Sequence, residues 1–151
     1  MKHLIRAARS GDLSGLVRLQ QVFEGDRLTT QTLARGLRSA SRLTLVVATA
    51  GRVSGSAIAL WRRNSRAVRL YDLAVARNSR RSGIGTALLK AVERRARRNG
   101  AVSIHLEVRA DNTGAQTFYR QNGYAPFGRY ERYYEDGADA LRMRKPLGIG
   151  N

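Results

Sequence analysis

The segment Arg80-Arg81-Ser82-Gly83-Ile84-Gly85-Thr86 has the composition of an anion-binding loop, since it follows an apolar stretch and runs directly into a helical pattern. Glycines let the backbone approach a ligand closely, and unpaired amides at a helix N-terminus, helped by the helix dipole, favour phosphate oxygens. The segment is not a P-loop, because Thr86 stands where lysine is required, and not a dinucleotide fingerprint, because Leu88 replaces the third glycine. The sequence predicts a pyrophosphate cradle, with an ordinary helix start as the alternative.

Composition narrows the remaining chemistry. The chain has 151 residues, no cysteine and two histidines, which excludes disulfides and a cysteine nucleophile and argues against a zinc site. This length suits one domain with a single core, so we expect residues 1–151 to form one domain. No stretch approaches the roughly 18 apolar residues of a membrane span. We therefore expect a cytoplasmic protein that binds neither a membrane nor a metal ion.

The formal net charge of +17 comes from 28 basic and 11 acidic residues. Such a field attracts anions, which include a nucleotide cofactor, RNA and an acidic protein surface. The charge does not choose among these partners. A compositional bias towards arginine at solvated positions is an equally good interpretation.

Helical periodicity predicts four helices, over Asp12–Phe23, Thr30–Ser39, Gly83–Asn99 and Thr113–Gln121. Ser10 or Asp12 is the expected cap of the first helix, and Thr29 that of the second. The third pattern is the strongest. Its apolar residues share one face, and the opposite face carries Arg94, Arg95, Arg97 and Arg98.

Runs of β-branched and apolar residues predict the strands. A short one opens the chain at Leu4-Ile5, and the others cover 43–49, 53–61, 67–75, 102–108, 125–133 and 138–145. In the strand over 67–75, simple alternation puts Val68, Leu70 and Asp72 on one face. The order is a strand, two helices, three strands, a helix, a strand, a helix and two strands.

Arg80-x-x-Gly83-x-Gly85 resembles the Arg/Gln-x-x-Gly-x-Gly/Ala cofactor motif of the GNAT acetyltransferase superfamily, and the predicted order of elements is that of the superfamily. Three further stretches resemble the RimI-type protein N-terminal acetyltransferases. They are Leu106-Glu107-Val108-Arg109 with Asn112 following, Phe118-Tyr119-x-x-x-Gly123-Tyr124, and residues 133–143. The resemblance covers about Leu70 to Leu147.

The resemblance implies a mixed α/β fold whose central sheet is mostly antiparallel, is split between its fourth and fifth strands and is flanked by helices. It also implies direct transfer of an acetyl group from acetyl-coenzyme A to an amine, with no metal. The residues it assigns to the cofactor are Leu73, Ala74 and Val75 for the pantetheine arm, Arg80, Arg81, Ser82, Gly83, Ile84, Gly85 and Thr86 for the pyrophosphate, and Asn112 for the pantetheine. A helix cap is an equally good role for Asn112.

Two residues carry the chemistry that the resemblance implies. Tyr119 corresponds to the tyrosine that protonates the departing thiolate, and a phenol with a pKa of about 10 suits a leaving thiol with a pKa of about 8.5 or above. Packing on the sheet is the structural alternative for Tyr119. Glu107 corresponds to the general base, acting through water or with a raised pKa, and a structural ion pair with an arginine is its alternative.

The acceptor amine must be neutral to attack a thioester. At pH 7 an α-amine needs only about 1 to 1.4 kcal/mol to lose its proton, whereas a lysine needs roughly 4.6 kcal/mol. A site with a single glutamate as its apparent base therefore suits the α-amine of a protein or peptide N-terminus. Tyr133 and Tyr134 resemble the residues of a substrate-gripping hairpin, but neighbours on a strand face opposite ways, so we expect at most one to touch the acceptor.

Two other interpretations stay open. One is a GNAT enzyme that acetylates a lysine or a small amine, which is disfavoured because an acid-poor chain should lack the acidic pocket that a polycation needs. The other is a module that binds RNA or the ribosome through the arginines of residues 94–98 and has a vestigial acetyl site. It lacks the interleaved aromatic residues of base-stacking domains, and we expect at most weak RNA or ribosome association.

Overall fold

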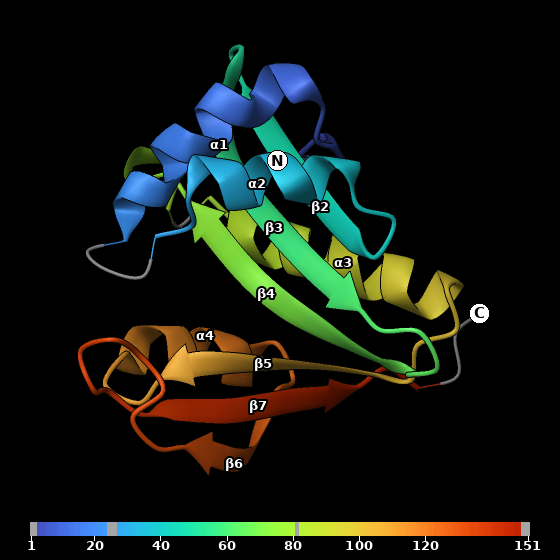
Figure 1. Ribbon diagram of the computed structural model, residues 1–151, viewed down its shortest axis with the longest axis vertical. Helices are drawn as coiled ribbons and strands as arrows, with labels where there is room; N and C mark the ends of the chain where they lie inside the picture. The colour runs from blue at the N-terminus through green and yellow to red at the C-terminus, as the bar shows by residue number, and fades with distance from the viewer. Residues whose placement is uncertain (1–2, 24–26, 81, 149–151) are drawn as a thin grey trace.

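The computed structural model describes residues 3–23, 27–80 and 82–148, and its helices and strands follow in the predicted order (Figure 1). Short 3₁₀ turns at Ser10–Asp12, Gln20–Val22 and Arg77–Ser79 precede or follow helices. The helices are α1 Leu13–Leu19, α2 Thr30–Arg38, α3 Ile84–Arg98 and α4 Thr113–Gln121. The strands are β1 Ile5–Ala7, β2 Arg42–Thr49, β3 Arg52–Trp61, β4 Ala67–Val75, β5 Ser103–Arg109, β6 Ala125–Tyr130 and β7 Ala140–Pro146.

The strands form one seven-stranded sheet in the order β1-β2-β3-β4-β5-β7-β6. Every neighbouring pair is antiparallel except β4 and β5, which are parallel. Their pairing is short, because only Ala67–Arg69 align with Ser103–His105. Beyond that point the two strands diverge, so the sheet opens like a V (Figure 1). The predicted mostly antiparallel sheet, split between its fourth and fifth strands, is confirmed.

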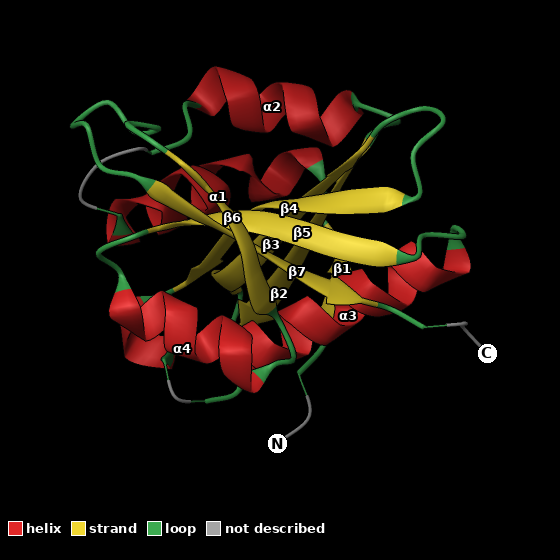
Figure 2. Ribbon diagram, turned by 90° about the horizontal axis from the view of Figure 1, so that it is seen from below, coloured by secondary structure: helices red, strands yellow, loops and turns green. Residues whose placement is uncertain are grey.

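Helices cover both faces of the sheet, with α1 and α2 on one side and α3 and α4 on the other (Figure 2). The larger core lies under α3 and contains Leu88, Leu89, Ile104 and Met143, all fully buried. A smaller core under α1 and α2 joins Leu16, Leu33, Val46 and Ile58. Each helix therefore buries one apolar stripe on the sheet, as its periodicity predicts.

A bulge in β4 corrects one prediction. Ile58 of β3 pairs with Asp72, but the next residue of β3 pairs with Leu70, so Tyr71 is the extra residue on β4. An extra residue shifts the alternation by one position, so each side chain after the bulge lies on the face opposite to that expected for an unbroken strand. As a result Leu70 and Leu73 both contact the larger core, and Asp72 turns to the opposite face. The prediction that Val68, Leu70 and Asp72 share a face was wrong because simple alternation assumes an unbroken ladder.

The helix ends agree with the sequence in part. The Thr29 hydroxyl accepts a hydrogen bond from the Thr32 amide at 3.0 Å and caps α2 as predicted. Asp12 precedes α1 but makes no capping bond to it. Its carboxylate accepts instead from the Arg9 amide at 2.8 Å and pairs with the Arg6 guanidinium at 2.7 Å. These two contacts occupy the Asp12 carboxylate oxygens that would otherwise accept hydrogen bonds from the first amides of α1.

Two other expectations near the end of the chain need correction. Strand β6 ends at Tyr130 rather than at Tyr133, because Arg132 has a φ of 48° and begins a turn. Arg97 does not belong to the free arginine face of α3, since it is half-buried and its Nε donates to the Leu147 carbonyl at 3.0 Å. Arg94, Arg95 and Arg98 are exposed, as expected.

Close packing fixes where α3 begins. A Cβ atom on Gly55 of β3 would lie 2.7 Å from Cγ2 of Ile84 and 3.0 Å from Cδ1 of Leu88. A side chain at position 55 would therefore force Ile84, in the first turn of α3, to shift. The first turn of α3 thus lies directly on the sheet, and the loop before it reaches the open edge of β4.

Candidate functional site

A cavity of about 880 Å³ lies where β4 and β5 diverge. Strand β4 contributes Leu70, Tyr71, Asp72 and Leu73, and strand β5 contributes residues 106–109. The remaining wall comes from Val22 and Phe23 after α1, from Asp111, Asn112, Ala115 and Tyr119 at the start of and within α4, and from Tyr134, Glu135 and Asp136 in the β6–β7 turn. Five separate parts of the chain meet at this one point.

The cavity is acidic although the protein is strongly basic. Of the 11 acidic residues in the chain, five line the cavity, namely Asp72, Glu107, Asp111, Glu135 and Asp136. Among the described lining residues Arg109 is the one basic side chain. The expectation that an acid-poor chain lacks an acidic pocket was wrong, because folding gathers carboxylates that are far apart in the sequence.

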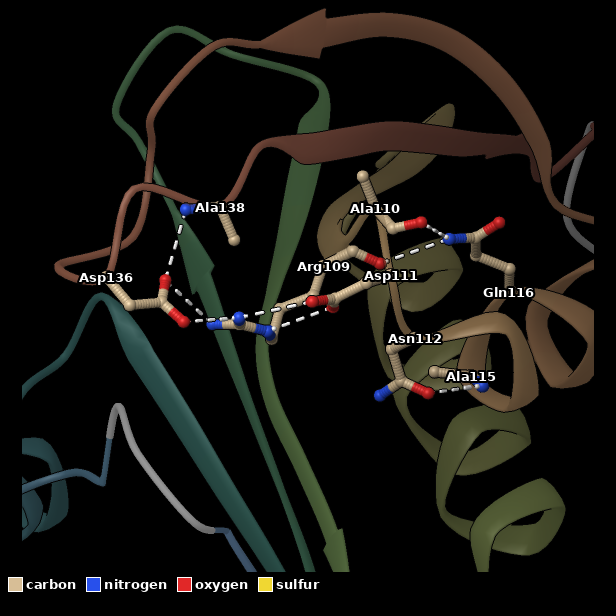
Figure 3. Close-up of polar contacts among 8 residues, drawn as sticks. All are labelled: Arg109, Ala110, Asp111, Asn112, Ala115, Gln116, Asp136 and Ala138. Atoms are coloured by element: carbon tan, nitrogen blue, oxygen red, sulfur yellow. Dashed lines mark hydrogen bonds and ion pairs between the residues drawn. The ribbon is translucent and has the colours of Figure 1, made fainter.

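Arg109 ties two of these carboxylates together at the end of β5 (Figure 3). Its Nη2 donates to Asp136 at 2.6 Å, and its Nε donates to Asp111 at 3.2 Å. Asp136 also accepts from the Ala138 amide at 3.1 Å. The guanidinium therefore holds the β6–β7 turn against β5 and closes one side of the cavity.

Glu107 points into the cavity but is paired. Its Oε1 lies 2.6 Å from Nη2 of Arg69, and its side chain is 7% exposed. The same Nη2 donates to the Tyr133 hydroxyl at 2.8 Å. The ion pair that the sequence left as the structural alternative for Glu107 is present, and the role of Glu107 as base stays a prediction.

Tyr119 projects from α4 into the same cavity. Its ring makes edge-on contacts with Phe118, at 5.2 Å between centroids, and with Tyr124, at 5.8 Å. Burial raises the pKa of the Tyr119 phenol, and the charges of Asp72 and Tyr134 raise it further. The phenol therefore stays protonated at neutral pH, as a proton donor must.

Sequence reasoning missed four acidic residues of the cavity, namely Asp72, Asp111, Glu135 and Asp136. Oδ2 of Asp72 accepts a hydrogen bond from Nε2 of Gln20 at 3.0 Å. Burial raises the pKa of Asp72 to about 6, although the Gln20 bond acts in the opposite direction. A carboxylate inside a run of strand residues could have been questioned from the sequence, because the alternation placed it on an apolar face.

The two neighbouring tyrosines of the β6–β7 turn have different surroundings. Tyr134 lines the cavity, and its ring lies 5.0 Å from the guanidinium carbon of Arg109. Tyr133 is exposed, stacks on Tyr130 at 5.4 Å and accepts the Arg69 bond. The adjacent side chains therefore face different ways, and Tyr134 is the one that faces the cavity.

The predicted cradle begins α3. Gly83 precedes the helix with a φ of 83°, a left-handed conformation that glycine adopts without strain. No described side chain caps the helix, and its first internal bond runs from the Ala87 amide to the Gly83 carbonyl at 3.0 Å. The amides of residues 84–86 are therefore free of helical partners and suited to an anion.

The loop before Gly83 adds positive charge. Arg80 is exposed, and the Ser82 hydroxyl donates to the Ser79 carbonyl, which folds the loop back on itself. His3 of the N-terminal segment holds the loop from outside through a 2.8 Å hydrogen bond to the Ser82 carbonyl. The predicted contact of Arg81 lies outside the described residues.

The edge of β4 and Asn112 fit the predicted pantetheine path. Leu73, Ala74 and Val75 pair with β3, whereas the pairing with β5 has already ended at Arg69. Their edge towards the split is thus open. The Asn112 side chain accepts from the Ala115 amide at 3.0 Å and caps α4 (Figure 3), and Asn112 also lines the cavity. Both of its predicted roles are geometrically compatible.

Within the described ranges no three His, Asp or Glu side chains are grouped so as to hold a metal ion. No helix in the described part of the chain is long and apolar enough to cross a membrane.

Comparison with known proteins identifies the family of this chain. Residues 5–147 match the acetyltransferase (GNAT) domain family. An uncharacterized N-acetyltransferase of Methanocaldococcus jannaschii is 43% identical over 84 residues, which are 54% of this chain and 54% of that protein. The N-alpha-acetyltransferase RimI of Mycobacterium tuberculosis is 45% identical over 67 residues, 44% of this chain and 40% of that protein. The chain thus aligns with about half the length of the curated relatives it matches.

Solved structures extend the likeness over the whole fold. Ard1 from Thermoplasma volcanium superposes with a TM-score of 0.87 at 28% sequence identity. The superposition covers 97% of this chain and 98% of the Ard1 chain. A ribosomal-protein-alanine N-acetyltransferase from Brucella melitensis has a TM-score of 0.82 at 24% identity, with coverages of 95% and 99%. The second likeness shows the fold alone. With a family match over nearly all of its length, the chain belongs to the GNAT acetyltransferase family.

Proposed function

We propose that this protein transfers the acetyl group of acetyl-coenzyme A to the α-amine of a protein or peptide N-terminus. The observation that carries the proposal is the cavity in the split sheet. The protonated phenol of Tyr119 and the carboxyl groups of Glu107 and Asp72 all line it. Curated relatives named as N-alpha-acetyltransferases support the choice of acceptor.

Acetyl-coenzyme A fits the other end of the site. The uncapped first turn of α3 would hold its pyrophosphate through the amides of residues 82–86, with Arg80 in the loop before it. The open edge of Leu73, Ala74 and Val75 would receive the pantetheine arm, together with Asn112. The thioester that it supplies is the acyl donor, and the residues of the cavity act on the amine and on the departing sulfur.

The proposed chemistry is a direct displacement. The neutral amine forms a bond to the thioester carbon while the bond from carbon to sulfur breaks. Glu107, acting directly or through water, accepts the proton that the amine nitrogen loses as the bond forms. Tyr119 gives its proton to the sulfur and regains one from the protonated Glu107 through the cavity. Tyr134 would contact the acceptor peptide, and Tyr133, bonded to Arg69, would shape the turn that carries it.

A thiol-release assay tests this proposal. Purified protein and acetyl-coenzyme A are combined with peptides that have a free α-amine, with the same peptides blocked at the N-terminus but containing lysine, and with small diamines. We expect turnover on the free α-amine, with the modified atom located by mass spectrometry. Turnover on the blocked peptides alone would overturn the proposal.

The acidic lining favours a second candidate, a lysine side chain or a polyamine as acceptor. Five carboxylates around one cavity attract a cation, whatever its kind. Three of them are already paired with arginine, however, namely Glu107, Asp111 and Asp136. A lysine must also lose a proton with a pKa near 10.4 rather than about 8, which makes an α-amine the better acceptor.

Location in the cytoplasm stays a prediction.

A further inference from the structure

We propose that Asp72 is a further catalytic residue of this site, the carboxylate that binds the incoming α-ammonium and takes its first proton. The inference rests on the proposed function, because it assigns a role towards the acceptor of that reaction. It gives Glu107 and Asp72 separate tasks. Asp72 prepares the nucleophile before attack, and Glu107 receives the second proton during attack.

The bulge in β4 places Asp72 for this task. Because Tyr71 is the extra residue, the Asp72 side chain leaves the larger core and lines the cavity on the side of α1. Gln20 donates to Oδ2 at 3.0 Å and is itself 3% exposed and fixed by the Leu28 amide, which donates to its Oε1 at 2.9 Å. Within the described residues Oδ1 accepts no hydrogen bond, so one oxygen is oriented and the other is available to an ammonium.

The partners of the cavity carboxylates separate Asp72 from the others. Glu107 is paired with Arg69 at 2.6 Å, and Asp111 and Asp136 are paired with Arg109. A carboxylate that is already paired with an arginine attracts a second cation less strongly, because its charge is largely neutralised. The described partner of Asp72 is a neutral amide, and Glu135 is exposed at the rim. Among the described residues, Asp72 is therefore the half-buried acid of the cavity with no cationic partner, and the ammonium of a substrate could take that place.

The basicity of Asp72 suits an α-ammonium. Asp72 has a pKa of about 6, so proton transfer to it from an ammonium of pKa near 8 is unfavourable by a factor of about 100. For an ordinary aspartate the factor would be about 10,000. The ammonium loses one proton to Asp72, and the resulting amine attacks. That proton then leaves to solvent through the cavity mouth. The second nitrogen proton follows the path through Glu107, so all protons are accounted for.

The test is Asp72→Asn, which keeps an oxygen for Gln20 and removes the basic site. At saturating acetyl-coenzyme A, kcat/KM for a peptide with a free α-amine is measured from pH 6 to pH 9. The variant depends on amine that is already neutral, which is only about one tenth of the total at pH 7. We therefore expect the ratio of variant to wild type to be about tenfold lower at pH 7 than at pH 9, and lower still at pH 6. The other ionisable groups that line the cavity are all retained, namely Tyr71, Glu107, Arg109, Asp111, Tyr119, Tyr134, Glu135 and Asp136.

Matched variants complete the test. Glu131→Gln removes an exposed carboxylate outside the cavity lining and should follow the wild type at every pH. Glu107→Gln should lose activity by a factor that high pH does not restore. If Asp72→Asn folds poorly, as judged by its melting temperature, Asp72→Ser serves the same purpose.

A ratio of variant to wild type that is near one, or that is reduced equally at all pH values, would overturn the role of Asp72. Failure of the wild type itself on every α-amine peptide would instead overturn the proposed function.

Discussion

The cofactor end of the site and the acceptor end are assembled in different ways. The cofactor end is nearly continuous in the chain, because Leu73 to Val75 lead through one short loop into α3, and its proposed contacts are made by backbone atoms. The acceptor end brings together β4, β5, α4, the β6–β7 turn and the segment after α1, and its proposed contacts are made by side chains. A local motif can specify the first. The second depends on how the sheet is bent and where its strands separate.

The largest effect should come from the acceptor end. Tyr119→Phe keeps the ring that packs on Phe118 and Tyr124, so the fold and the affinity for acetyl-coenzyme A should change little. Loss of the proton donor should lower kcat by roughly 100-fold or more. An acyl donor with a more acidic thiol should recover part of that rate in the variant and gain little in the wild type. Near-normal turnover by the folded variant would leave Tyr119 as a packing residue.

The cofactor end can be broken at Gly83. Acetyl-coenzyme A should raise the melting temperature of the protein. At a concentration of about 100 times its Kd, it should raise the free energy of unfolding by about 2.7 kcal/mol. Gly83→Val should abolish most of this shift, because a side chain would strain the left-handed turn that presents the amides.

A matched control lies at the other end of the same helix. Gly100 has a φ of 84° and open space around its missing Cβ, so Gly100→Val suffers a similar strain without touching the cradle. It should keep the shift. Equal loss in both variants would mean that strain, and not the cradle, explains the result, and stabilisation by ATP but not by coenzyme A would reassign the ligand.

A smaller effect should appear in stability rather than in rate. The pKa of Asp72 is raised by folding, from about 3.9 in an unfolded chain to about 6. Between these values the folded state binds a proton that the unfolded state does not, so stability falls as pH rises from 4 to 6 and stays lowered above that range. Asp72→Asn lacks this cost. Its free energy of unfolding should exceed that of the wild type by about 1 to 3 kcal/mol at pH 8 and match it near pH 3.5.

Denaturant titrations at the two pH values measure this difference. The outcome also sharpens the comparison, because a residue kept for stability should weaken the protein when replaced. A variant that is more stable but less active at pH 7 is typical of a functional carboxylate. Reduced stability of Asp72→Asn at pH 8 would contradict the burial cost that we assign to it.

The smallest effect should come from the exposed arginines of α3, which belong to neither end of the site. We propose that they account for weak, nonspecific RNA binding and have no part in acetyl transfer. Replacing Arg94, Arg95 and Arg98 with glutamate should abolish salt-sensitive RNA binding and leave peptide acetylation unchanged. Arg97 is left in place because it holds Leu147. Tight, sequence-selective RNA binding by the wild type at physiological salt would favour the RNA-binding interpretation instead.

Sequence patterns were sufficient to predict the order of elements, the bounds of α4, the Thr29 cap and the glycine that precedes α3. These features depend on interactions between residues close in the chain, such as helical spacing, capping and glycine conformation, so a local pattern specifies them. The folded chain was needed to find the bulge at Tyr71, the pairing of Glu107 with Arg69, the acidic cavity and the environment of Asp72. Each of these depends on partners that are dozens of residues apart, and on burial, which shifts a pKa by an amount that residue type alone does not contain.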